Sequence, residues 1–141
     1  MRTQTGLLAI IGVFGWVAAA DAQTVASATT GAAFDGKYRF MSSTKVNEMY
    51  TSYNGQSGMC PYRKPGPLHI AGGRVHYTAG SGYRFDGMVG PQGELTMRSE
   101  MVGSSRPAHM QASGTVDGSG TVHIRQAGSS CAYDFVWQKQ S

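Results

Sequence analysis

Strict alternation of side chains around a tight turn most limits the folds open to this chain, and it is clearest in residues 83–101. Gly90-Pro91-Gln92-Gly93 suits a type I turn, because proline fixes φ at the first central position and glycine accepts a left-handed conformation. The predicted hairpin has mostly apolar inner pairs: Val89 with Leu95, Gly87 with Met97, Phe85 with Ser99 and Tyr83 with Met101. Its outer pairs are Met88 with Thr96, Asp86 with Arg98 and Arg84 with Glu100. A slip of one residue would exchange the two faces, so the register is well specified.

The first 22 residues are typical of a secretory signal peptide. Arg2 precedes an apolar run over residues 6–17, and the small residues that follow offer a cleavage site after Ala22. A membrane anchor is the alternative, but this run is too short to span a bilayer. Residues 23–33 are expected to form a flexible lead-in, and residues 34–141 a single domain.

Charge and cysteine content narrow the classes of partner and site. Without the signal, 141 − 22 = 119 residues remain, with 11 basic and 7 acidic side chains. The excess is small and dispersed, so a nucleic-acid partner has little support. Cys60 and Cys131, in a chain bound for an oxidising compartment, predict a disulfide. This bond would leave neither thiol for a metal ion or for nucleophilic catalysis.

Alternating side chains predict four further strand-forming segments. They cover residues 34–40, a hairpin over 68–77, a hairpin over 114–125, and residues 131–137. Gly72-Gly73 forms the turn of the first of these hairpins and sets His69 directly opposite His76. The other hairpin repeats the spacing of the central one and should pair Val116 with Val122 and Gly114 with Ile124.

In residues 42–54 the spacing of apolar residues changes from the alternation of a strand to the spacing of a helix. Val46, Met49, Tyr50 and Tyr53 recur at helical spacing, so a short amphipathic helix is expected over residues 43–53, ending at Asn54-Gly55. An irregular loop with buried tyrosines is the alternative.

Together these segments predict an all-β fold, an eight-stranded antiparallel up-and-down meander that closes into a small barrel. A half-open barrel or a sandwich is the alternative. Across the loop after Thr78, the expected pairs are Tyr77 with Tyr83, Val75 with Phe85 and Arg74 with Asp86. Three inward-facing glycines either ease strand bending or leave room for a ligand: Gly36, Gly87 and Gly114.

Few residues offer catalytic or metal chemistry. His69 and His76 are a candidate metal pair, but the sequence places no third ligand beside them; the neighbour expected on the next strand is Arg84. His109 and His123 are isolated on other strands, and no nucleophile elbow or phosphate-binding loop occurs. No catalytic residue and no cofactor is therefore predicted.

Binding is the remaining class of function. The predicted interior is crowded with aromatic side chains, whereas the loops at one end carry Tyr53, Tyr62, Arg63 and Lys64. Aromatic and basic groups of this kind are enriched at recognition surfaces, so these four residues are the candidate binding residues.

Several of these motifs also occur together in a group of proteins that the chain resembles. The opening Phe34-Asp35-Gly36-Lys37-Tyr38, Cys60 before the Gly-Gly hairpin, and the closing Cys131-x-Tyr-x-Phe strand look like uncharacterised small exported β-proteins of proteobacteria. The general plan is also similar to lipocalin-like and avidin-like barrels and to periplasmic inhibitors of lysozyme or proteases. The lipocalin Gly-x-Trp start is missing.

The resulting expectation is a non-enzymatic, exported binding module, periplasmic or secreted, that meets a protein or other envelope component through its end loops. An inhibitor is one form of such a module. One alternative is a carrier of a small apolar ligand inside the barrel. Another is a small secreted hydrolase that depends on a histidine.

Overall fold

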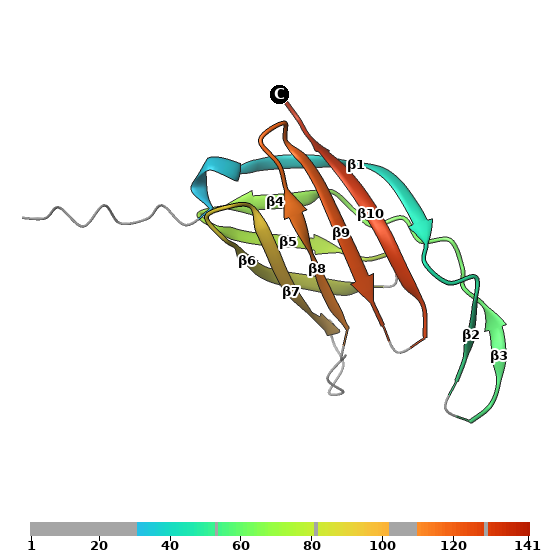
Figure 1. Cartoon of the computed structure of the whole chain (residues 1–141). Coiled ribbons are helices and arrows are strands. Elements are labelled where there is room, and N and C mark those ends of the chain that lie inside the picture. Colours follow the sequence, from blue (N-terminus) through green and yellow to red (C-terminus); the bar gives the residue numbers. More distant parts are fainter. Residues whose placement is uncertain (1–30, 53, 81, 102–109, 129) are drawn as a thin grey trace, which may run out of the picture.

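The computed structural model describes residues 31–52, 54–80, 82–101, 110–128 and 130–141. Their main element is a closed eight-stranded barrel, and a separate two-stranded sheet stands beside it (Figure 1). The barrel strands are β1 (Gly36–Lys45), β4 (Leu68–Ala71), β5 (Arg74–Thr78), β6 (Tyr83–Val89), β7 (Glu94–Met101), β8 (Gln111–Val116), β9 (Thr121–Ala127) and β10 (Ala132–Lys139). The small sheet contains β2 (Met49–Thr51) and β3 (Ser57–Met59). The predicted signal peptide lies outside the described residues.

Strand β1 closes the barrel. Its first residues pair with β4, Gly36 opposite Ile70 and Tyr38 opposite Leu68, while its length pairs with β10. A register shift between Phe40 and Ser42 interrupts the β10 ladder, and a bulge of this kind bends a strand and increases its twist. Closure gives β1 a neighbour on each side, β10 along most of its length and β4 over Gly36 to Tyr38, so the barrel has no end strand without a partner strand.

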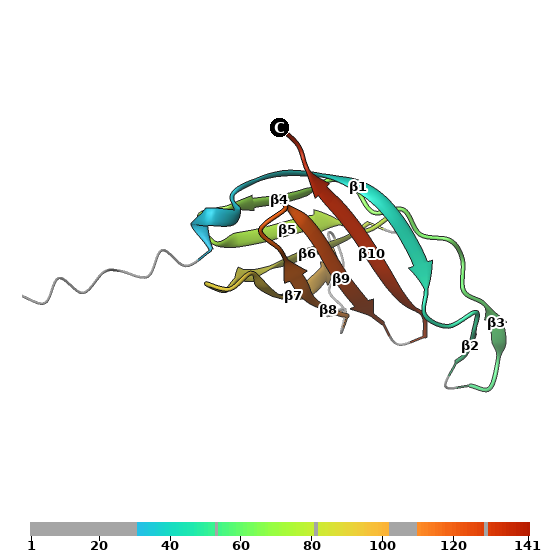
Figure 2. The same cartoon turned by 45° about the horizontal axis from the view of Figure 1, so that its top comes forward.

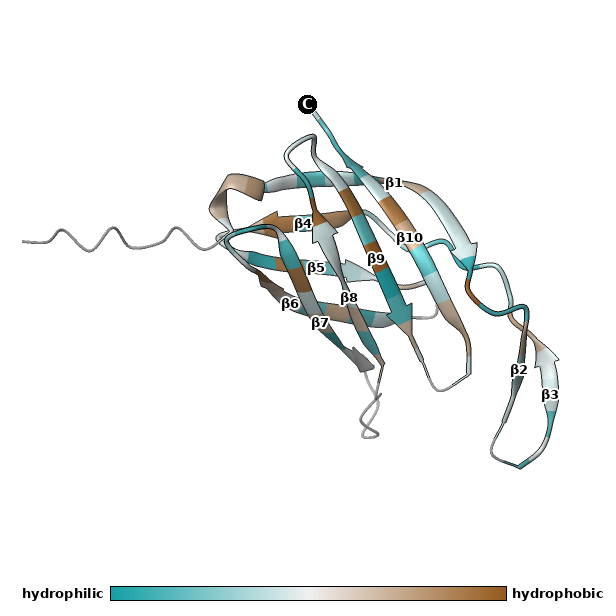
Figure 3. Cartoon of the chain, viewed as in Figure 1, coloured by the Kyte–Doolittle hydropathy of each residue, from teal (hydrophilic) through white to brown (hydrophobic). Residues whose placement is uncertain are grey.

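The barrel interior is a packed core. Side chains from all eight barrel strands fill it, and the largest fully buried ones are Trp137, Tyr38, Tyr77, Phe85 and Phe135. The rings of Tyr77 and Phe85 stack with their centroids 4.9 Å apart. Along β9 the hydropathy alternates between apolar and polar residues (Figure 3), as expected for a strand with one buried face.

The three predicted hairpins have the predicted registers. Val89 lies opposite Leu95, His69 opposite His76, and Gly114 opposite Ile124. The eight-stranded antiparallel barrel and the closure of the first strand on the last are likewise confirmed.

The helix predicted over residues 43–53 is wrong. Strand β1 continues to Lys45, and β2 and β3 then form a hairpin in which Met49 lies opposite Met59. Thr, Val and Tyr are poor helix formers, and pairing with β3 satisfies the backbone of β2 better than an isolated turn of helix would. Val46 lies just after β1, and Met49 and Tyr50 lie in β2, so the apparent helical spacing of these apolar residues spans a break between two strands.

The predicted register between β5 and β6 is also wrong, by two residues. Tyr77 pairs with Phe85 instead of Tyr83, and Asp86 pairs with His76 instead of Arg74. The backbone N–H of Ala79 bonds to the carbonyl of Tyr83, and Gly82 has a φ of +84°, so the turn lies one residue later than expected. Because a shift of two keeps every side chain on its face, the core was still predicted correctly.

The folded chain also begins earlier than expected. Residues Ala32–Phe34 form a 3-10 helix, and Gly31 packs against Val89 with a φ of +71°. The last residues of the predicted lead-in are therefore part of the fold, while residues 23–30 lie outside the described residues.

Close approach of neighbouring strands explains two of the inward-facing glycines. A Cβ at Gly114 would lie 1.8 Å from the carbonyl oxygen of His123, and one at Gly87 would lie 2.0 Å from that of Thr96. The adjacent backbone thus occupies the space that a side chain would need. These positions serve strand packing and leave no room for a ligand.

Candidate binding site at the barrel mouth

A long segment outside the barrel connects β1 to β4. This segment includes the β2–β3 hairpin, which projects away from the barrel in both views (Figures 1 and 2). Residues 61–67 then return to β4 and are called the strap. We call the end of the barrel beside the strap and the hairpin the mouth.

A disulfide attaches the hairpin to the barrel. Cys60, directly after β3, bonds to Cys131, directly before β10, as predicted, across 71 positions of sequence. Closing a loop of this length is worth about 4 kcal/mol in the chain-entropy model. The hairpin therefore has a covalent anchor at its base in addition to its backbone hydrogen bonds.

The strap is fixed by hydrogen bonds from core side chains. The Tyr133 hydroxyl donates to the carbonyl of Pro61 at 2.8 Å, and the Trp137 indole N–H donates to the carbonyl of Gly66 at 3.0 Å. The backbone N–H of Gly66 donates to the carbonyl of Thr78. Two of the largest core residues thus use their polar groups to hold the strap, which gives the mouth a defined shape.

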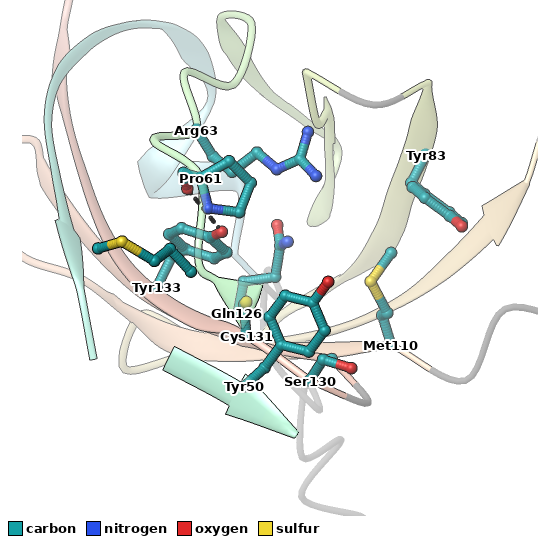
Figure 4. Close-up of a pocket in the computed structure, with 11 residues that line it drawn as sticks. Tyr50, Pro61, Arg63, Tyr83, Met110, Gln126, Ser130, Cys131 and Tyr133 are labelled. Atoms are coloured by element: carbon teal, nitrogen blue, oxygen red, sulfur yellow. Dashed lines mark hydrogen bonds between the residues drawn. The ribbon is translucent and has the colours of Figure 1, made fainter. Parts of the chain in front are cut away.

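A pocket of about 490 Å³ lies at the mouth between the hairpin base, the strap and the ends of the barrel strands (Figure 4). Its walls are mostly aromatic and sulfur-containing side chains, with a few polar groups. The lining residues are Tyr50, Met59, Pro61, Arg63, Tyr83, Met110, Gln126, Gly128, Ser130, Cys131 and Tyr133. The volume falls in the range of small-ligand sites in proteins.

Tyr50 enters the pocket because of the residue opposite it. Tyr50 pairs with Gly58 across the hairpin, and a Cβ at Gly58 would lie 2.8 Å from the Tyr50 ring. Glycine thus lets the ring lie across the neighbouring strand. The side chain of Tyr50 then faces the pocket (Figure 4).

Gln126 is the buried polar group of the pocket. Its side chain is only 6% exposed, and its Oε1 accepts a hydrogen bond of 2.8 Å from the Tyr77 hydroxyl. Burial raises the pKa of that hydroxyl, so Tyr77 stays protonated and donates its proton to Gln126. This bond sets the orientation of the amide and leaves Nε2 as a donor.

The predicted binding residues are only partly brought together. Tyr62 is 65% exposed and Lys64 is exposed on the strap, whereas Arg63 is half-buried and lines the pocket. Tyr53 lies outside the described residues. The arrangement therefore separates Arg63, which faces a cavity, from Tyr62 and Lys64, which face solvent.

The histidine pair adopts the predicted register without forming a larger metal cluster. The rings of His69 and His76 stack with centroids 5.1 Å apart. Burial, then the charges of His76 and Lys37, lower the pKa of His69. Within the described ranges, no group of three His, Cys, Asp or Glu residues is placed to hold a metal ion. Asp86, which pairs with His76, bonds to Arg84 instead, at 2.8 Å. His109 lies outside the described residues.

Sequence reasoning missed most of the pocket. Tyr50 was expected in the apolar stripe of the predicted helix, and Tyr83 on the inner face of the barrel. Met110 and Gln126 were not among the predicted binding residues. The one available signal was Gln126 itself, a polar residue at an inward position between Ile124 and the end of the strand. A polar side chain on a core face needs a partner or a ligand.

None of the residues described by the structure forms a helix with the length and hydrophobicity needed to span a bilayer. Comparisons of the chain with protein-family models, with curated proteins and with solved structures gave no match.

Proposed function

We propose that the protein is an exported, non-enzymatic binding module that recognises another protein through the β2–β3 hairpin and the strap. The observation that carries this proposal is the position of the exposed apolar side chains. Of the six large hydrophobic side chains exposed in the described part of the chain, five lie between positions 41 and 62: Met41, Val46, Met49, Met59 and Tyr62.

The centre of this surface is a methionine pair. Met49 and Met59 lie directly opposite each other on the hairpin, and their side chains are 60% and 68% exposed. Flexible, polarisable methionine side chains are common on surfaces that bind protein partners. Met49 and Met59 on the hairpin and Tyr62 on the strap expose apolar groups away from the core, which favours association with another protein.

Basic and aromatic groups beside the methionines support the same reading. Tyr62, Arg63 and Lys64 follow the hairpin directly, and Tyr and Arg are enriched at protein interfaces. The disulfide and the strap hydrogen bonds hold this surface in place before binding, which lowers the entropy cost of association.

Export is supported by the predicted signal peptide and by the disulfide, since such bonds persist in oxidising compartments. An inhibitor of an envelope or secreted protein fits this surface, because inhibitors commonly act through a rigid projecting element.

The two alternative functions have less support. A carrier needs space inside the barrel, where Tyr38, Phe85 and Trp137 are fully buried. A hydrolase needs a histidine positioned by a carboxylate, and none of the described histidines forms a hydrogen bond to one. We therefore place the binding function at the mouth end.

Site-specific photo-crosslinking tests the proposal. A photoreactive residue replaces Met59 in the full chain, in cells of a host that produces the protein, and crosslinked proteins are identified by mass spectrometry. Met88 on β6, which is 56% exposed on the barrel wall, is the matched control position. We expect a discrete protein adduct from position 59 and none from position 88.

Substitution then tests the contribution of the surface to affinity. For this test the photoreactive residue replaces Tyr62, so that both methionines can be substituted. We expect the double variant Met49→Ser, Met59→Ser to lower the yield of the crosslink to the same partner protein at least about tenfold, because apolar area is lost from the interface. Met88→Ser should leave the yield unchanged. The same adducts from positions 59 and 88, or no adduct from position 59, would refute the proposed surface.

A further inference from the structure

The walls of the mouth pocket combine apolar and polar groups and come from elements far apart in sequence. Tyr50 and Met59 belong to the hairpin, Tyr83 to β6 and Tyr133 to β10, while Met110 directly precedes β8. Pockets of this size with aromatic and methionine walls bury the apolar part of a small ligand. The walls alone do not define its polar end.

The polar side chains of the pocket can all donate hydrogen bonds to a ligand, and Arg63 can only donate. Arg63 provides the only charge among the lining residues, which include no Asp or Glu. Among the described residues no ion pair or side-chain hydrogen bond of Arg63 occurs, although its side chain is half-buried. Figure 4 shows the Arg63 guanidinium, the Gln126 amide and the Tyr50 hydroxyl on the side chains that border the same space.

Gln126 presents a second hydrogen-bond donor to the pocket. Its Oε1 accepts from the Tyr77 hydroxyl, while its Nε2 makes no hydrogen bond to a described residue and stays accessible from the pocket, although the residue as a whole is 6% exposed. An acceptor on a bound molecule would satisfy Nε2 in the pocket that Gln126 lines.

From these observations, we infer that the mouth pocket binds a carboxylate attached to an apolar or aromatic group. The carboxylate would pair with Arg63, whose planar fork of donors matches two carboxylate oxygens, and accept a further bond from Gln126. One guanidinium without a neighbouring cation in the lining matches a single negative charge, which favours a carboxylate over a dianionic phosphate.

Met59 and Arg63 border both the pocket and the proposed partner surface, but this inference does not need a protein partner, because the contacts assigned to the carboxylate come from Arg63 and Gln126 within the pocket. The same chemistry has two sources, a free small acid or the C-terminal residue of a peptide. Four probes distinguish them: 3-phenylpropanoate, its neutral amide, the dipeptide N-acetyl-glycyl-phenylalanine with a free C-terminal carboxylate, and that dipeptide with a C-terminal amide.

NMR titration of the oxidised, ¹⁵N-labelled mature protein gives the readout. We expect saturable shifts of the Gln126 side-chain amide with at least one of the two acids. The matching amide should bind at least about tenfold more weakly, the effect of losing a charge-assisted hydrogen-bonded pair. Shifts with both acids point to a general carboxylate site, and shifts with the dipeptide alone to a chain terminus.

Charge-matched variants separate the pocket from the overall basic charge. Arg63→Gln should weaken acid binding at least about tenfold. Arg39→Gln, which removes one exposed cation from β1 outside the pocket, should change it less than about twofold. An unchanged amide spectrum away from the mouth shows that each variant is folded.

Three results would overturn the inference. They are equal affinity for the acids and the amides, equal loss of affinity in both variants, and the absence of any saturable shift with either acid.

Discussion

Asn47 and Ala132 are joined by a side-chain hydrogen bond in which the Asn47 Oδ1 accepts from the backbone N–H of Ala132 at 2.9 Å. The Asn47 Nδ2 donates to the carbonyls of Met49 and Ser130, each at 2.9 Å. One amide therefore connects the stem of the hairpin to the turn between β9 and β10. It lies beside the disulfide, with Nδ2 3.4 Å from the Cys60 sulfur.

Replacing Asn47 tests how much these side-chain hydrogen bonds contribute to stability. We expect Asn47→Ala to lower the free energy of unfolding by about 2 kcal/mol, because it removes several hydrogen bonds and leaves the part-buried N–H of Ala132 unpaired. Urea denaturation of the oxidised protein measures the change. Gln140→Ala, at an exposed position near the C-terminus, should stay within about 0.5 kcal/mol of wild type. Equal losses in both variants would contradict the role assigned to Asn47.

Gly114 should not tolerate a side chain. Gly114→Ala is expected to destabilise the protein by about 3 kcal/mol or to prevent folding, because its Cβ would meet the backbone of β9. Thermal unfolding measures the effect, and Gly118→Ala is the matched control. A Cβ at Gly118 would meet no heavy atom within 4 Å, so the unfolding temperature of Gly118→Ala should stay close to that of wild type. Similar transitions for both variants would show that β8 and β9 can separate to admit a methyl group.

His69 should make stability depend on pH. Its pKa in the folded protein is lowered from 6.5, by burial and then by His76 and Lys37. Below pH 6.5 the unfolded chain therefore binds more protons than the folded one, so stability falls as the pH drops from 6.5 towards the folded pKa.

His69→Gln should flatten this part of the profile. We expect a smaller difference between the urea midpoints at about pH 7.5 and about pH 5.5 than in wild type. His76→Gln removes one cause of the shift in the pKa of His69 and leaves burial, so its profile should lie between the two. A His69→Gln profile that matches wild type would show that this imidazole does not couple to folding.

Much of the barrel could be predicted because its signals are local. The pairs Val89 with Leu95 and Gly114 with Ile124 follow from turn residues that lie between them in sequence. The turn between β5 and β6 has weaker signals, so its centre was misplaced, and Asp86 was assigned to Arg74 when it pairs with His76. Two residues of displacement leave the side-chain pattern unchanged, so alternation could not reveal the error.

The pocket could not be predicted in the same way. Arg63 was chosen as a binding residue, but its companions Tyr50, Tyr83 and Gln126 are brought to it by barrel closure, by the strap and by a hairpin expected to be a helix. No spacing along the chain links them.

Local periodicity by itself determined the β class of this protein, its three hairpins and the side chains that form the core, because the pleat of a strand sends neighbouring residues to opposite faces. Composition and the predicted signal pointed to the Cys60–Cys131 bond. Only the tertiary structure decided that the chain between Lys45 and Leu68 forms a projecting hairpin and a strap, and that a cavity opens where they meet the barrel. A cavity depends on the positions of elements that are distant in sequence, and these positions are set when the whole sheet closes.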